Sequence, residues 1–181
     1  QLECALEHAD AVRLDVPALG PAATLVSPEQ KKASLEAIRA YVKGNPRLDP
    51  YRFAAQVLAG MGNPPPVRDR WLDRKLTWDQ VGELARDSLF EVGAHGRSHR
   101  ILSFLSAEEL ERELGESISK VRAAAGRDGV HFSYPEGLAH CYSEQVIERL
   151  KAHGIRCSPT AIEGANPPGT DPFHLRRLFV V

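Results

Sequence analysis

Short apolar segments alternate with amphipathic helical patterns from residue 89 to the end of the chain. Helices are indicated at residues 106–125 and 143–153 by apolar residues that recur every three or four positions. They separate stretches with the composition of short strands, which are residues 89–92, residues 130–134, a segment beginning at residue 155, and residues 175–181. This alternation is typical of a mostly parallel sheet covered by helices, so the second half of the chain is predicted to have an α/β fold.

The first half of the chain is predicted to be mainly helical. A short, half-exposed strand at residues 11–16 is followed by two helices, at residues 28–43 and 50–61. The first helix begins behind Ser27 and Gln30, which have the pattern of a capping box. Both helices carry an apolar stripe, so we expect them to serve as packing elements.

The segment Asn63-Pro64-Pro65-Pro66 marks the clearest candidate boundary, because consecutive prolines form a stiff, extended linker. We expect residues 1–66 to be a helical insertion, or a partial N-terminal part of the fold. Residues 67–181 are expected to contain its core. The motifs that suggest chemistry all lie in the second of these ranges.

Charge and composition favour a neutral ligand over a nucleic acid. The 181 residues contain 23 Lys and Arg against 24 Asp and Glu, so no basic surface is indicated for nucleic acid or an anionic membrane. No run approaches the ~18 apolar residues of a membrane span. The three cysteines are too widely spaced to form a Cys-x-x-Cys site. A sugar polymer is a partner that fits this composition.

Two histidines, His95 and His99, lie four residues apart in the loop between the predicted strand at residues 89–92 and the helix at residues 106–125. Ligands and chemistry collect at loops that leave strand ends in sheets of this kind. Neutral imidazole is a common zinc ligand, and two rings at this spacing can converge on one ion if the loop coils. On spacing alone, two solvated histidines explain the pattern more often, so both interpretations stay open.

Two segments resemble motifs of one enzyme family. The run from Phe90 to Leu102 is similar to the second motif of the polysaccharide deacetylases, the NodB-like domains of carbohydrate esterase family 4. His131-Phe132-Ser133-Tyr134-Pro135-Glu136-Gly137 resembles a variant of the third motif, and residues 166–177 are similar to the end of such domains. The resemblance covers residues 76–181 and implies a distorted, partly open (β/α) barrel, of which this chain supplies the later strands.

The resemblance also implies an activity. It suggests a metal-dependent deacetylase that hydrolyses N-acetyl groups, with O-acetyl groups as a neighbouring option, on a poly- or oligosaccharide. His95 and His99 would be ligands of zinc or a similar divalent ion. In the third motif, the backbone N–H of Glu136 would stabilise the oxyanion, and Tyr134 and Pro135 would form a wall of the substrate groove.

Three departures from the family pattern leave an alternative open. The first motif, an Asp pair that supplies the third metal ligand and the general base, has no counterpart here, so we expect the chain to be the C-terminal part of a domain whose missing N-terminal part acts as its partner. Gly96 replaces a Ser or Thr. Glu136 places a carboxylate where it would oppose the oxyanion. The alternative is a catalytically degenerate protein of this fold that binds carbohydrate without turnover.

Overall fold

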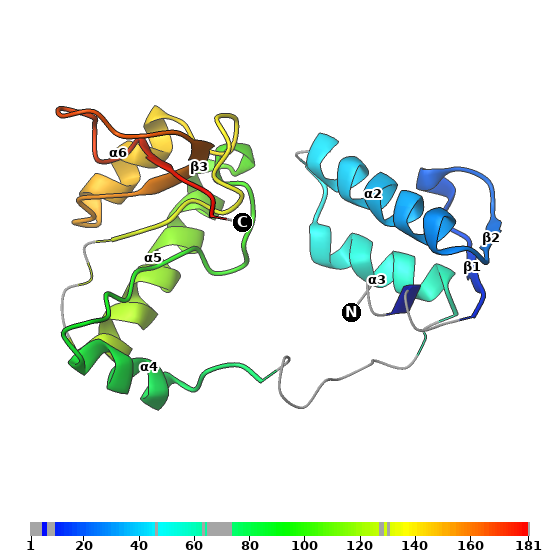
Figure 1. Cartoon of the computed structure of the whole chain (residues 1–181), viewed down its shortest axis with the longest axis horizontal. Coiled ribbons are helices and arrows are strands. Elements are labelled where there is room, and N and C mark those ends of the chain that lie inside the picture. The colour runs from blue at the N-terminus through cyan, green and yellow to red at the C-terminus, as the bar shows by residue number, and fades with distance from the viewer. Residues whose placement is uncertain are drawn as a thin grey trace. The chain divides into compact units, whose positions relative to one another are not determined.

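The chain forms two compact units, Gln1–Arg74 and Lys75–Val181, each with a hydrophobic core of its own (Figure 1). The computed structural model describes residues 5, 6, 10–45, 47–62, 64, 74–126, 129 and 131–180. The boundary expected between residues 66 and 67 lies outside the described residues. None of the described helices combines the length and the apolar character needed to cross a bilayer.

The first unit packs two helices on a small antiparallel sheet. Strand β1 (Val12–Leu14) pairs with β2 (Ala23–Leu25), and the connection between them contains the 3-10 helix η1 (Pro17–Leu19). The two helices are α2 (Pro28–Gly44) and α3 (Pro50–Gly60). The predicted strand and both predicted helices are confirmed. Helix α2 begins as expected, because Ser27 and Gln30 form the two hydrogen bonds of a capping box. Strand β2 was not predicted from the sequence.

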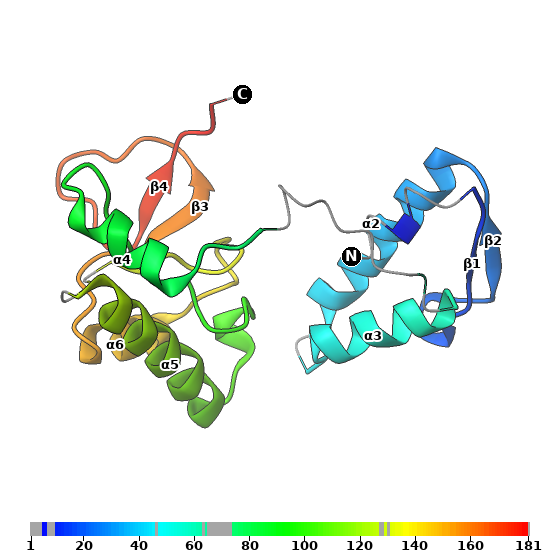
Figure 2. The same ribbon diagram turned by 90° about the horizontal axis from the view of Figure 1, so that it is seen from below.

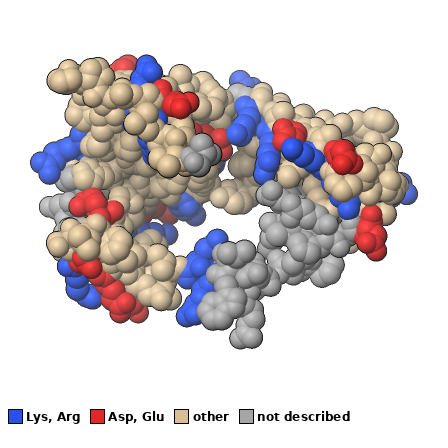
Figure 3. Space-filling view, in the orientation of Figure 1, with Lys and Arg blue, Asp and Glu red and all other residues tan. Residues whose placement is uncertain are grey.

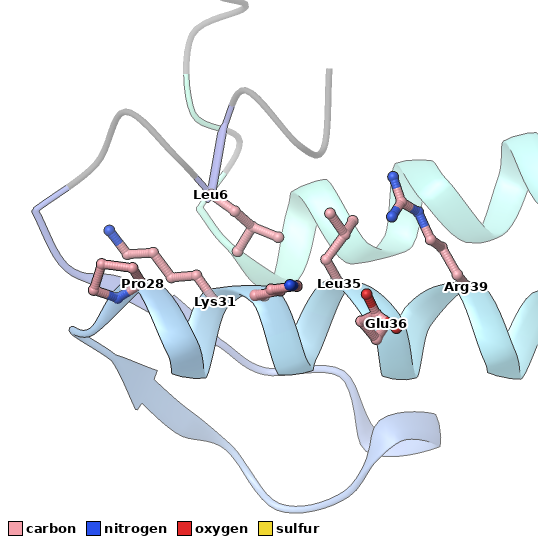
Figure 4. Close-up of a pocket in the computed structure, with 7 residues that line it drawn as sticks. Leu6, Pro28, Lys31, Leu35, Glu36 and Arg39 are labelled. Atoms are coloured by element: carbon pink, nitrogen blue, oxygen red, sulfur yellow. The ribbon is translucent and has the colours of Figure 1, made fainter. Parts of the chain in front are cut away.

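A pocket lies along α2 in the first unit (Figure 4). Leu6 lies over this helix near Leu35, within the same hydrophobic cluster. The residues lining the pocket are Leu6, Pro28, Lys31, Lys32, Leu35, Glu36 and Arg39. The pocket therefore contains none of the residues predicted to bind metal or substrate.

The second unit contains helices α4 (Trp78–Arg86), α5 (Ala107–Ala125) and α6 (Glu144–Ala152), together with the 3-10 helix η2 (Leu102–Phe104). Helix α5 contacts both α4 and α6 (Figure 2). Its capping box, from Ser106 to Glu109, and its left-handed C-terminal residue Gly126 confirm the predicted helix and its ends.

The strands of the second unit are short and parallel. Ala94 bridges to Phe132, His131 bridges to Cys157, and β3 (Pro159–Glu163) pairs with β4 (Leu175–Arg177). All of these pairings are parallel, so the expected α/β fold is confirmed in its class. The described strands do not close into a barrel.

One predicted strand is wrong. Leu89 and Phe90, expected to be buried, are 85% and 48% exposed. Asp87 accounts for the difference, because its carboxylate accepts the Leu89 N–H at 2.9 Å and its carbonyl accepts the Phe90 N–H at 3.2 Å. These bonds form a turn after α4, and the paired segment begins only at Ala94.

Candidate metal centre

His95 leaves the sheet at a point fixed by backbone pairing. The Ala94 N–H donates to the His131 carbonyl at 3.1 Å, and the Ser133 N–H donates to the Ala94 carbonyl at 2.9 Å. The His95 Nδ1 atom lies 2.7 Å from the Ser133 carbonyl oxygen. Because a carbonyl can only accept, Nδ1 carries the proton, and Nε2 is the nitrogen with a lone pair to offer a metal.

His99 is brought to His95 by a coiled loop. Its backbone has a φ of 55°, a left-handed conformation that is uncommon for a residue other than glycine. The two imidazole centroids lie 4.9 Å apart, with the ring planes at 72°. The structure thus brings together the two side chains that were predicted as metal ligands, while metal binding by them stays a prediction.

Helix α5 holds this loop with a row of carboxylates. Glu113 accepts two hydrogen bonds from Ser98, from its N–H at 2.5 Å and from its hydroxyl at 2.7 Å. Glu109 and Glu116, about one turn to either side, form ion pairs with the loop arginines Arg100 at 3.0 Å and Arg97 at 2.8 Å, respectively. The Ser106 N–H and, next, the Arg100 guanidinium lower the pKa of Glu109 to about 2.

Gly96 lies directly against this row. Its φ is 85°, and a Cβ atom there would lie 3.1 Å from Glu113 Oε1 and 3.4 Å from Pro135 Cγ. The family pattern has Ser or Thr at this position. In this chain the left-handed backbone and the close carboxylate favour the glycine, which gives a local reason for the departure.

The third-motif segment turns sharply at Glu136 and Gly137, whose φ angles are 60° and 65°. Tyr134 is 2% exposed, and its hydroxyl donates to the Phe173 carbonyl at 3.1 Å. Its burial raises the pKa of the phenol. Pro135 is also fully buried, so both side chains pack within the second unit beside the turn, and their role as a wall of the substrate groove stays a prediction. Oxyanion stabilisation by the Glu136 N–H stays a prediction.

Sequence reasoning missed two residues of the site, Glu113 and Arg177. Arg177, at the end of β4, donates to the Ser133 hydroxyl at 2.6 Å and so contacts the residue whose carbonyl holds His95. Glu113 could have been noticed, since a charged residue between Leu110 and Leu114 lies on the apolar stripe of its helix. No local pattern marks Arg177, which is 44 residues from its partner.

The donor set fits two of the ligands of a divalent ion. Two neutral imidazoles suit zinc or a similar metal. A hydrogen bond from the other ring nitrogen to a backbone carbonyl, as His95 makes to Ser133, is common among histidines that bind zinc. Over the residues that the structure describes, no third His, Cys, Asp or Glu joins the pair in a group that could hold a metal ion. A catalytic zinc site has three protein ligands, so the described pair would by itself supply two of them.

Comparison with known proteins gives the family. Among curated proteins, none matches the chain. A deacetylase of Streptococcus pyogenes, PplD, solved in complex with acetate, is 17% identical, with a TM-score of 0.54 over 60% of this chain and 46% of that one. The deacetylase domain of BpsB from Bordetella bronchiseptica is 18% identical, with a TM-score of 0.50 over 71% of this chain and 65% of that one.

The chain therefore spans less than two thirds of these two proteins, and at such identities the likeness shows the fold alone. The profile of the family described as polysaccharide deacetylase matches residues 30–158. The match includes α2 and α3 as well as both motifs of the second unit. Because it covers more than half of the sequence, the chain belongs to the polysaccharide deacetylase family.

Proposed function

We propose that this protein is a metal-dependent hydrolase that removes N-acetyl groups from a poly- or oligosaccharide, with His95 and His99 as two of the metal ligands. The observation that carries the proposal is the convergence of the two imidazoles at 4.9 Å, with Nδ1 of His95 engaged by the Ser133 carbonyl. Family membership supports the reaction class. O-acetyl groups are the second choice of substrate.

The chain's own residues would bind and orient the reacting groups. A divalent ion held by the two histidines would supply Lewis-acid polarisation of the acetyl carbonyl and a lowered pKa for the attacking water. The hydrogen bond to Ser133 keeps His95 in the tautomer that presents Nε2. The backbone N–H of Glu136, on the turn beside Tyr134 and Pro135, would donate to the developing oxyanion.

The third ligand and the general base would come from carboxylates outside the described residues. We propose that they complete the site in a distorted, partly open barrel, to which the parallel segments described in the second unit contribute. Residues 1–66 would form the helical insertion or partial N-terminal part, and residues 67–181 would form the core.

A neutral glycan is compatible with the surface. On the face drawn in Figure 3, acidic and basic side chains are interspersed within each unit, in keeping with a net charge of -1. A strongly anionic polymer would be attracted to a surface with a clear excess of one charge. We therefore propose a neutral acetylated sugar as the substrate class.

The function is tested by acetate release. The purified protein is incubated with N-acetylglucosamine oligomers before chelation, after chelation, and after zinc is restored. Chelation is expected to lower the rate by at least about 100-fold, and zinc is expected to restore it, because the metal supplies several kcal/mol of transition-state stabilisation. Acetate release that survives chelation would contradict the proposal. Oligomer binding without acetate release would favour a non-catalytic carbohydrate-binding protein instead.

A further inference from the structure

We propose that Glu113 is a positioning residue for the histidine pair, acting through Ser98. Its carboxylate sets the conformation of the loop from His95 to His99, and so the distance between the two imidazoles. The inference rests on the proposed function in one respect, namely that the pair binds a metal.

The burial of Glu113 needs an explanation. Its exposed fraction is 5%, and it lies on α5 between Leu110 and Leu114, which are buried completely or almost so. A buried carboxylate is unfavourable unless hydrogen bonds or an opposite charge compensate for its lost hydration. In the part of the chain that the structure describes, no ion pair involves Glu113, and its hydrogen bonds both come from Ser98. The lost hydration of the Glu113 carboxylate is therefore compensated by the two hydrogen bonds from the loop.

The hydrogen bonds between Glu113 and Ser98 are well placed to control the position of His99. It precedes His99 directly, and both its N–H and its hydroxyl are held by the two oxygens of one carboxylate. The residues around it, Gly96 and His99, have left-handed backbones with φ angles of 85° and 55°. A histidine keeps that conformation only where its surroundings compensate for the strain. The two hydrogen bonds that Ser98 donates to the carboxylate contribute to that compensation, because hydrogen bonds to a charged acceptor are stronger than neutral ones.

The loop is packed tightly on the carboxylate. A Cβ atom at Gly96 would approach Glu113 Oε1 to 3.1 Å. The glycine thus lets the backbone of the loop come close to Glu113, and two residues further along the loop Ser98 donates its N–H to the same carboxylate. A change in the length or shape of the side chain at position 113 is therefore expected to move both Gly96 and Ser98.

The neighbouring carboxylates provide a matched control. Glu116 lies one turn from Glu113 and contacts the same loop through Arg97, at 2.8 Å, but both side chains of this pair are more than one third exposed. An exposed ion pair is screened by water and contributes little to conformation. Glu116→Ala therefore removes a charge from the same face of α5 without removing the bonds to Ser98.

The test compares Glu113→Ala, Glu113→Gln and Glu116→Ala by zinc affinity, measured by competition with a chromophoric chelator. Glutamine can still accept the Ser98 N–H and can donate to its hydroxyl oxygen, so it preserves the geometry without the charge. Glu113→Ala is expected to weaken zinc binding by about 10-fold or more, whereas Glu113→Gln and Glu116→Ala are expected to stay within about threefold of the parent protein. An alanine variant with parent-like affinity, or a glutamine variant as weak as alanine, would overturn the inference.

A second measurement separates this inference from the proposed function. In the metal-free protein, hydrogen exchange of the Ser98 amide and nuclear Overhauser contacts between the His95 and His99 rings report the loop conformation directly. Both are expected to persist in Glu113→Gln and to be lost in Glu113→Ala. If the parent protein binds no zinc, the proposed function fails, and this measurement alone decides the role of Glu113. Unchanged exchange and ring contacts in the alanine variant would then refute it.

A fourth variant, Ser98→Ala, covers the case in which Glu113→Ala does not fold, as circular dichroism would show. Ser98→Ala removes only the hydroxyl bond and leaves the N–H bond in place. It is expected to weaken zinc binding by more than about threefold, beyond the range expected for the control variants, and to reduce the ring contacts. Parent-like zinc affinity together with intact ring contacts in Ser98→Ala would count against the positioning role.

Discussion

Replacement of His99 by alanine is expected to lower the rate of acetate release from N-acetylglucosamine oligomers by about three orders of magnitude. One imidazole cannot hold the ion that two hold together, and the lost electrostatic stabilisation amounts to several kcal/mol. Each tenfold in rate corresponds to about 1.4 kcal/mol. The measurement is kcat/KM for the variant and the parent protein at saturating zinc.

The left-handed backbone at His99 calls for a second variant. Its φ of 55° is strained for alanine but tolerated by asparagine, so His99→Asn removes the imidazole with less disturbance of the loop. The two variants are expected to lose similar activity while His99→Asn keeps the higher melting temperature. Loss of a metal ligand is expected to lower the rate far more than about twofold. A rate within about twofold of the parent protein in His99→Asn would therefore show that the imidazole is not needed.

The substitution Gly137→Ala is expected to reduce the free energy of unfolding of the second unit by about 3 kcal/mol. The glycine has a φ of 65°, which accounts for about 1 kcal/mol of strain in an alanine. Its Cβ atom would lie 2.6 Å from the backbone nitrogen of Ala161, at the start of a hydrogen bond of 2.8 Å to the Gly137 carbonyl. Neither backbone can move without breaking this bond, so overpacking accounts for the rest. Urea unfolding measures the difference.

Gly169 provides the control for Gly137. Its φ is 89°, but a Cβ atom there would meet nothing within 4 Å, so Gly169→Ala carries the backbone strain alone. It is expected to cost about 1 kcal/mol. If the two substitutions destabilise the unit equally, the close contact between the third-motif turn and β3 does not contribute.

Helix ends were predictable because their signals are local. The capping box predicted behind Ser27 joins residues three apart and is formed in the structure, and the described helices α4 and α5 begin with the same motif, behind Thr77 and Ser106. Short strands were less predictable. A short group of apolar residues is compatible with either a strand or a turn. At Leu89 the segment forms a turn, because the Asp87 carboxylate accepts the Leu89 N–H.

The site was predictable only where its residues are close in sequence. The spacing of His95 and His99 suggested their convergence, which depends on one loop. The contacts that orient them are not local, because Ser98 meets Glu113 across 15 residues and Ser133 meets Arg177 across 44. Such contacts depend on how α5 and β4 pack, which no pattern in the loop itself specifies.

The most direct test of the account is the zinc stoichiometry and affinity of the purified protein, compared with its His95→Ala/His99→Ala double variant. Titration calorimetry or chelator competition measures both quantities. The account predicts tight binding of about one ion per chain, as expected for a single mononuclear site, with binding lost in the double variant. Absence of binding in the parent protein, or binding that persists unchanged in the double variant, would contradict it.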